Sequence, residues 1–249
     1  MPSPSSLTRC HLPKVGGLGS PCKVCGFARG SPFDRLPPRR GKMAKPKGGT
    51  GWTRSGLRGL AAKIMNYATI KYYDIANGPG VRTSVFVSGC RHHCPGCFNA
   101  VAWDFDYGQP FDKPTRNEVF ASCQPDYIAG LSLLGGEPME PENQRELLPF
   151  VRNFKALYPN KTVWCYSGYT WEQLTGKEPS LARCEATDEL LSLLDVLVDG
   201  EFVEAKHDIS LRFRGSSNQR LLDVKKTLAA GKPVWWEDEK VFATHTMER

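Results

Sequence analysis

The sequence predicts an α/β protein built around a parallel sheet. The prediction rests on short apolar segments typical of buried strands, on helical patterns between them, and on the glycine-containing loop after each of the last three strands. These loops also carry the polar residues Glu137, Ser167 and Asp199. Because the carboxyl ends of parallel strands meet at one edge of a sheet, we expect these residues to gather at one site.

Strands and helices are predicted in alternation from residue 65 onward. Apolar residues recur at three- and four-residue steps over residues 144–158, which predicts an amphipathic helix, and a second helix is expected over residues 187–194. The turn Asn77-Gly78-Pro79-Gly80 separates the first two strands. The five predicted strands span residues 67–73, 81–87, 127–134, 162–166 and 195–199.

Chain length limits the architecture of this α/β domain. Of the 249 residues, 185 lie in the segment 65–249. A complete barrel of eight strand–helix units needs about 250 residues. We therefore expect an incomplete (β/α) barrel with fewer units and an open side.

The net charge of +7 is divided unequally along the chain. Residues 1–64 contain 13 Lys and Arg, one acid, 11 Gly and 8 Pro, whereas residues 65–249 have a net charge of −5. Such a Gly/Pro-rich composition opposes helix, sheet and core. We expect residues 1–64 to be a disordered basic extension and residues 65–249 to be the functional domain, with translation beginning near Met65 or Met43.

The extension offers two weaker interpretations. Cys22 and Cys25, with Cys10 and His11, could form a zinc knuckle, but the second ligand pair is cramped. The basic residues could bind nucleic acid, but they are not interleaved with aromatic residues as a stacking platform requires. We expect neither a zinc site here nor direct nucleic-acid binding.

Two features of the sequence indicate the cellular compartment. They are the lack of a segment that could cross a membrane and the number and spacing of the cysteines. No run of 18 apolar residues occurs, and the N-terminus has no apolar core of a secretory signal, so no membrane association is expected. The nine cysteines are an odd number, and three of them fall within eight residues. This pattern favours metal or redox ligation in a reducing cytoplasm over a disulfide framework.

The clustered cysteines, Cys90, Cys94 and Cys97, have the spacing C-x3-C-x2-C and follow the second predicted strand. Their thiolates can converge on one soft metal centre. Zinc would need a fourth ligand, which His92, His93 or a distant cysteine could supply. An iron–sulfur cubane held by three cysteines would instead leave one iron open.

The cysteine spacing and a second motif, Gly135-Gly136-Glu137-Pro138 after a later strand, resemble the radical S-adenosylmethionine (SAM) enzymes. Glycines permit close approach of a backbone to a ligand, and a carboxylate can accept the ammonium group of SAM. The segment 77–82, Asn-Gly-Pro-Gly-Val-Arg, is similar to the glycyl-radical-enzyme activases. Four further segments resemble the branch that acts on anaerobic ribonucleoside-triphosphate reductase: residues 94–99, 168–171, 195–202 and 214–220.

The resemblance implies a one-electron reaction. A flavodoxin-like or ferredoxin-like donor would reduce a [4Fe-4S] cluster held by the three cysteines, and SAM would be cleaved to methionine and a 5′-deoxyadenosyl radical. That radical would take hydrogen from a glycine of the large catalytic subunit of anaerobic ribonucleotide reductase. The residues implied in SAM binding are Gly96, Cys97, Phe98, Gly135, Gly136, Glu137, Ser167 and Asp199.

Several alternatives remain open at this point. Ser167 and Asp199 also suit ordinary turn or cap chemistry, and either Gly96 or Phe98 stands where an adenine contact is expected. The partner could be another glycyl radical enzyme, such as pyruvate formate-lyase. The chain could also be a non-catalytic zinc or iron–sulfur module that binds nucleic acid, although the acidic domain would repel phosphates.

Overall fold

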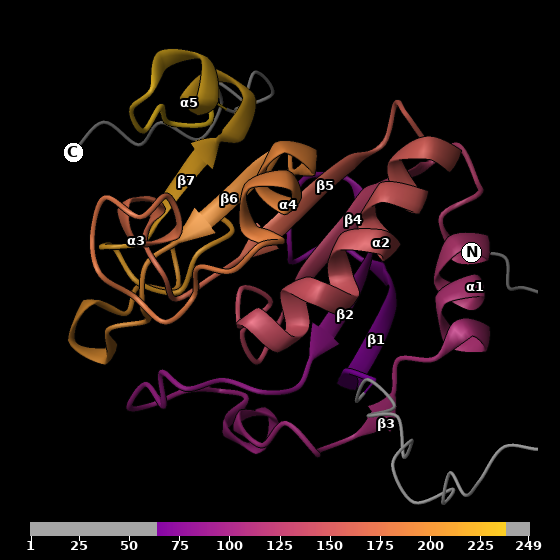
Figure 1. Cartoon of the computed structure of the whole chain (residues 1–249), viewed down its shortest axis with the longest axis horizontal. Coiled ribbons are helices and arrows are strands. Elements are labelled where there is room, and N and C mark those ends of the chain that lie inside the picture. The colour runs from indigo at the N-terminus through magenta and orange to yellow at the C-terminus, as the bar shows by residue number, and fades with distance from the viewer. Residues whose placement is uncertain (1–63, 238–249) are drawn as a thin grey trace, which may run out of the picture. The chain divides into compact units, whose positions relative to one another are not determined.

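The computed structural model describes residues 64–237, which form a seven-stranded mixed sheet flanked by helices (Figure 1). The strands lie in the order β3-β1-β2-β4-β5-β6-β7. The interpretations of residues 1–63, including the basic extension, the candidate start at Met43 and the possible zinc knuckle, lie outside the described residues.

The centre of the sheet is parallel. Strand β2 (Val81–Val87) pairs with β4 (Ile128–Gly135), β4 with β5 (Thr162–Tyr166), and β5 with β6 (Val196–Asp199), all parallel. The edges are antiparallel: β1 (Asn66–Asp74) pairs with β2 and with β3 (Gln109–Pro110), and β7 (Arg220–Asp223) pairs with β6. The four parallel strands therefore direct four successive loops to one edge.

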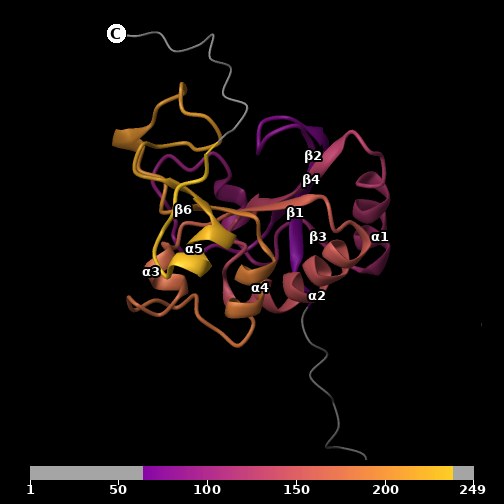
Figure 2. The ribbon, with the colours of Figure 1, turned by 90° about the horizontal axis from the view of Figure 1, so that it is seen from above.

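Three helices on one side of the sheet enclose the main core. They are α1 (Lys113–Ser122), α2 (Pro141–Leu157) and α4 (Thr187–Leu193), and Figure 2 shows α2 and α4 on the same side. Helix α2 begins at a proline, which suits the first helical position, and buries Leu147, Phe150, Val151 and Phe154. Alternate residues of β5, Val163 and Cys165, reach this core, as the period of a strand requires.

The other side of the sheet is covered by loops. Trp164, Val196, Val198 and Leu221 form a smaller apolar cluster there, against which Phe213 packs. The connection from β6 to β7 lies on this side (Figure 2) and includes the short helix η2 (Glu204–Lys206). The remaining elements are η1 (Ala100–Trp103), α3 (Trp171–Leu174) and α5 (Val224–Ala230).

The predicted α/β class is confirmed, and all five predicted strands are present with ends within one residue of the prediction. The helix expected at 144–158 begins three residues earlier, at Pro141. Strands β3 and β7 and helices α1, α3 and α5 were not predicted. No helix within residues 64–237 combines the length and the apolar character needed to span a membrane.

Candidate active site

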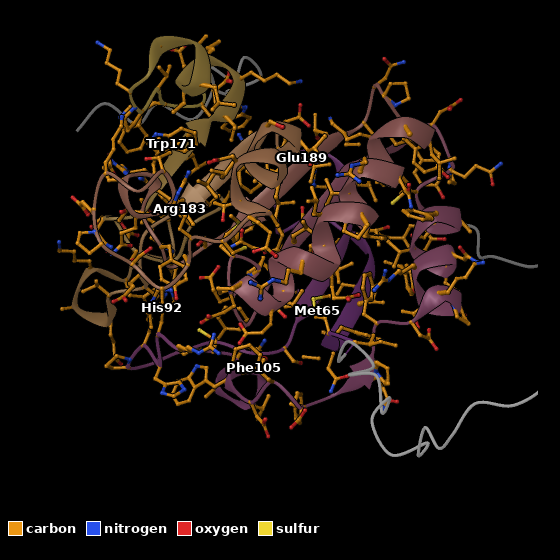
Figure 3. The ribbon with its side chains drawn as sticks, in the orientation of Figure 1. Met65, His92, Phe105, Trp171, Arg183 and Glu189 are labelled. Atoms are coloured by element: carbon orange, nitrogen blue, oxygen red, sulfur yellow. The ribbon has the colours of Figure 1, made fainter. Side chains whose placement is uncertain are left out.

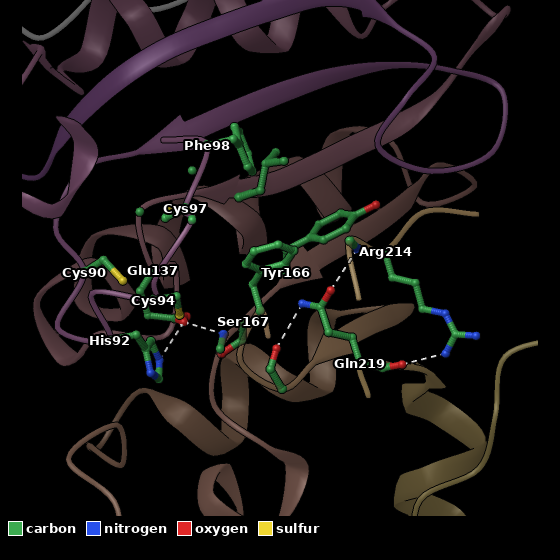
Figure 4. A pocket seen from close by; sticks show the side chains of 18 of the residues that line it. Cys90, His92, Cys94, Cys97, Phe98, Glu137, Tyr166, Ser167, Arg214 and Gln219 are labelled. Atoms are coloured by element: carbon green, nitrogen blue, oxygen red, sulfur yellow. Dashed lines mark hydrogen bonds and ion pairs between the residues drawn. The ribbon is translucent and has the colours of Figure 1, made fainter. Parts of the chain in front are cut away.

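A cavity of about 650 Å³ lies at the edge of the sheet where the parallel strands end (Figure 4). Its walls come from the loops after β2, β4, β5 and β6. Sequence reasoning nominated ten site residues, and nine of them line this cavity: Cys90, Cys94, Gly96, Cys97, Phe98, Gly135, Gly136, Glu137 and Ser167. The expected gathering at one edge is therefore present.

The cysteines lie on an irregular loop after β2, which also carries His92 (Figure 3). Its start is fixed by Gly89, whose N–H donates to Ala102 O at 2.8 Å. Gly89 has φ +94°, and a Cβ atom there would lie 2.2 Å from the ring of Phe105. Only glycine combines this backbone conformation with the small space beside the ring of Phe105. Further along, Cys97 N–H donates to Cys94 O at 3.2 Å, which turns the chain between the second and third cysteines.

The three thiols suit an iron–sulfur cluster. All three are free, and burial, with the nearby Glu137 carboxylate, raises the pKa of the Cys90 thiol to about 12 although the N–H groups of His92 and His93 donate to it. A metal centre would displace that proton. The three cysteines line one cavity, and in a cubane each of them would bind its own iron and leave the fourth iron open.

Glu137 supports the loops around it. The side chain is 1% exposed. Its Oε1 accepts from Met139 N–H at 2.7 Å and its Oε2 from Gly168 N–H at 2.6 Å. Each oxygen can accept a second bond, and the residue lines the cavity, so the contact with an ammonium group stays a prediction. The Glu137 side chain ties the loop after β4 to the loop after β5.

Gly136 also packs against protein backbone. A Cβ atom at this position would lie 2.6 Å from Gly89 O. The neighbouring Glu137 N–H donates to the same oxygen at 2.8 Å, and Gly136 N–H donates to Val87 O at 2.7 Å. The glycine therefore allows the loop after β4 to approach the start of the cysteine loop, a reason that differs from the expected approach to a ligand.

His92 joins three of the strand-end loops. Its Nδ1 is 2.7 Å from Glu201 Oε1 and its Nε2 is 3.2 Å from Glu137 Oε2, and its ring packs on Tyr169 with centroids 4.3 Å apart. Burial favours the neutral ring, but the two carboxylates outweigh it and raise the pKa of His92 to about 9. The His92 side chain is 8% exposed and lines the cavity. His93 is exposed.

Ser167 lies in the wall of the cavity directly after β5. Its N–H donates to Val198 O at 2.8 Å, and its hydroxyl accepts from Tyr169 N–H at 3.1 Å. The hydroxyl thus takes part in a turn, and its own proton remains free to donate. This geometry is compatible with both interpretations made from sequence.

Asp199 is the one nominated residue that does not line the cavity. It is buried; its Oδ2 accepts from Trp171 N–H at 2.7 Å, and both oxygens accept from Arg220, at 2.9 Å and 2.5 Å. Arg220 also bonds Glu172, and the two carboxylates raise the pKa of Arg220 further above its usual range. Asp199 therefore holds α3 and β7 together, and the neighbouring Gly200 is the residue that reaches the cavity.

The aromatic residue after the third cysteine stands at the mouth. Phe98 is 83% exposed and lines the cavity, while Gly96 lies against the Glu204 carboxylate. Of these two positions, only Phe98 presents a ring that a planar ligand group could stack on.

Much of the remaining wall was not predicted from sequence. Tyr166, at the end of β5, stands in the middle of the cavity in Figure 4, with its hydroxyl on the side away from the cysteines. In the sequence, Tyr166 ends a short apolar segment, which indicated only a buried strand. Other unpredicted lining residues come from the β6–β7 connection and include Phe202, Leu211 and Phe213. These residues lie in coil, where no periodic pattern marks them.

Comparison with known proteins identifies the family. The sequence model of the family described as a 4Fe-4S single cluster domain matches residues 76–222. The anaerobic ribonucleoside-triphosphate reductase-activating protein of Pasteurella multocida is 43% identical over 159 residues, 62% of this chain and 95% of that protein. The proteins of the same name from Escherichia coli K12 (40% over 157 residues, 62% of this chain and 96% of that one) and from bacteriophage T4 (38% over 157 residues, 63% and 93%) are similar. This chain thus belongs to the family of anaerobic ribonucleoside-triphosphate reductase-activating proteins.

Proposed function

We propose that this protein activates an anaerobic ribonucleoside-triphosphate reductase by generating a glycyl radical on the large subunit of that enzyme. The observation that carries the proposal is the meeting of Cys90, Cys94 and Cys97 with Gly135, Gly136 and Glu137 around one cavity. The names of the relatives support the same activity.

The three cysteines would hold a [4Fe-4S] cluster, and SAM would bind beside it against Phe98, the Gly135-Gly136 backbone and Ser167. When bound, the reduced cluster supplies the electron that cleaves SAM to methionine and a 5′-deoxyadenosyl radical, which takes a hydrogen atom from the reductase glycine. A flavodoxin-like or ferredoxin-like protein is the class of donor that such a low-potential centre requires.

The chain's own residues provide binding, orientation and exclusion of water. Glu137 and His92 fix the relative positions of the strand-end loops, so that the cysteines and the cavity wall keep one arrangement. Tyr166, Phe202 and Phe213 give the cavity apolar walls. Such walls exclude water, which would quench or hydrolyse reactive species.

The wider architecture is part of the proposal. We regard the sheet as an incomplete barrel of the radical SAM type, whose open side admits a polypeptide loop. Residues 65–249 would be the activase domain, residues 1–64 a dispensable extension, and the reducing cytoplasm the compartment. The names of the relatives favour a ribonucleotide reductase over pyruvate formate-lyase as partner, and the cluster-family match disfavours a zinc module that binds nucleic acid.

The proposal is tested by anaerobic reconstitution. The full chain should bind iron and sulfide in equal amounts, form 5′-deoxyadenosine from SAM on reduction, and produce a glycyl radical signal in added anaerobic reductase by electron paramagnetic resonance. Cys94→Ala should lose iron and all cleavage. Cys123→Ala, which removes a buried thiol at the C-terminal end of α1, is the matched control and should retain both. Tight zinc without iron, or a cluster that never cleaves SAM, would refute the proposal.

A further inference from the structure

The connection between β6 and β7 is longer than its ends require. Asp199 and Arg220 are paired across the two antiparallel strands, so a hairpin loop of about two to five residues would join them. Residues 200–219, which we term the strap, join them instead. Only the three residues of η2 in the strap are helical. Long connections with so little secondary structure in a compact domain are usually functional.

The strap forms one side of the cavity. It also borders a neighbouring groove of about 490 Å³, whose opposite wall is the segment 75–81. Ala76, Leu211 and Phe213 line both the groove and the cavity, so the two lie side by side. The strap residues that line the cavity are Gly200, Phe202, Glu204, His207, Leu211, Phe213, Arg214, Gly215 and Gln219.

One side chain holds the strap at three points. The Gln219 amide donates from Nε2 to Gly200 O at 3.0 Å, where the strap begins. Its Oε1 accepts from Gly215 N–H at 2.9 Å and from Ser216 N–H at 3.1 Å, where the strap returns. Figure 4 shows Gln219 at the wall opposite the cysteines. A single amide, with a donor and an acceptor, therefore fixes the base and the return of the strap together.

We infer that Gln219 is a positioning residue that holds the strap in the shape that receives an extended segment of the reductase polypeptide. The inference rests on the proposed function. The attacked glycine belongs to a protein, so its chain must enter the cavity from outside, and the groove bordered by the strap lies beside the cavity and shares wall residues with it. The strap also carries Ile209, which is 92% exposed and offers apolar area to a partner.

The chemistry of the amide explains why glutamine stands at this position. Gln219→Met keeps the length of the side chain but removes the donor and the acceptor, leaving Gly200 O and two N–H groups without this partner. Gln219→Glu keeps an acceptor for the two N–H groups, but it places a carboxylate oxygen against Gly200 O. Both variants should distort the strap while leaving the cysteine loop in place.

Steady-state activation of the reductase by the reconstituted holoenzyme tests the inference. For Gln219→Met we expect the KM for the reductase to rise about tenfold, because a strap that has lost these internal bonds no longer presents one fixed surface to the partner, while kcat falls much less. Direct binding of the two proteins should weaken by a similar factor. Gln124→Met, the same substitution at an exposed position on the loop after α1, should match the wild type in both measurements.

The outcomes separate this inference from the proposed function. A wild-type protein that yields no glycyl radical overturns both. An active wild type with an unchanged KM in Gln219→Met and Gln219→Glu overturns only the role of the strap. A fall in melting temperature with kcat reduced and KM unchanged would mean that Gln219 serves stability alone, and it overturns the inference as well. If Gln219→Met does not fold, Gln219→Glu is judged by the same KM criterion.

Discussion

The Asp199→Asn variant tests whether the Asp199 carboxylate stabilises the fold or binds the cofactor. In the structure the Asp199 carboxylate accepts from Trp171 N–H and twice from Arg220. Removing one partner of a fully buried pair costs about 3–5 kcal/mol. Arg220 is 27% exposed and keeps Glu172 as a second partner, so we expect a loss of about 2–3 kcal/mol here. For a domain of this size that loss lowers the Tm by about 5–10 °C.

The assay combines thermal unfolding, followed by circular dichroism, with the KM for SAM in reductive cleavage. We expect a lower Tm and a KM for SAM that stays within about twofold of the wild type, because Asp199 does not line the cavity. Asp188→Asn is the matched control: its pair with Arg183 is exposed and should contribute little to stability. An unchanged Tm together with a tenfold higher KM for SAM would refute the structural assignment.

Three further substitutions test polar groups in the interior. The Tyr166 hydroxyl is buried without a hydrogen-bond partner within residues 64–237, so Tyr166→Phe should leave chemical unfolding unchanged or make the protein more stable by up to about 1 kcal/mol. Tyr158→Phe should instead cost about 1 kcal/mol, since that hydroxyl donates to a backbone oxygen at 2.8 Å; equal losses in both would contradict this. Burial alone would raise the pKa of Asp195, but the bonds from Lys155, Lys225 and Val163 N–H together outweigh it and hold the pKa below its ordinary value of 3.8. The stability that Asp195→Asn removes should therefore be constant at neutral pH and vanish as the pH falls below that value, and a difference from wild type that persists in acid would count against the pairing.

The elements that sequence reasoning predicted are those whose signal is local. The parallel strands are short apolar runs, and α2 carries a clear apolar stripe, so their positions follow from residue order alone. Helix α1 has only Val119 buried and therefore no stripe to detect. Its available signals were the cap at Asp112, which accepts from Thr115 N–H at 3.0 Å, and a proline in the first turn. Those signals are weak without periodicity.

The residues of the candidate site also divide into those that have a local signal in the sequence and those that have none. Its cysteines and glycines could be nominated because they stand beside strand ends, and parallel strands bring their ends together. Tyr166 and the strap residues could not be nominated as a wall of the cavity. Which face of the sheet a strand residue occupies, and how a twenty-residue coil folds back, depend on contacts that are distant in sequence. The Gln219 bonds are an example, since one of them spans 19 residues.

The sequence suggested Glu137 and Asp199 as ligand-binding residues, but in the structure both side chains accept hydrogen bonds from other parts of the protein. The two residues do so for the same physical reason. Loops at the edge of a sheet have few apolar contacts, so buried N–H groups there need acceptors close by. The Glu137 carboxylate supplies two such acceptors, and Asp199 supplies another at the start of α3. A carboxylate that satisfies buried donors in this way fixes the loops around it. In the proposed site the ligands would meet the thiols of the cysteine loop, the backbone of the glycine loops and the rings of Phe98 and Tyr166. The specificity of the site should then depend on how the buried carboxylates and Gln219 hold those surfaces in place.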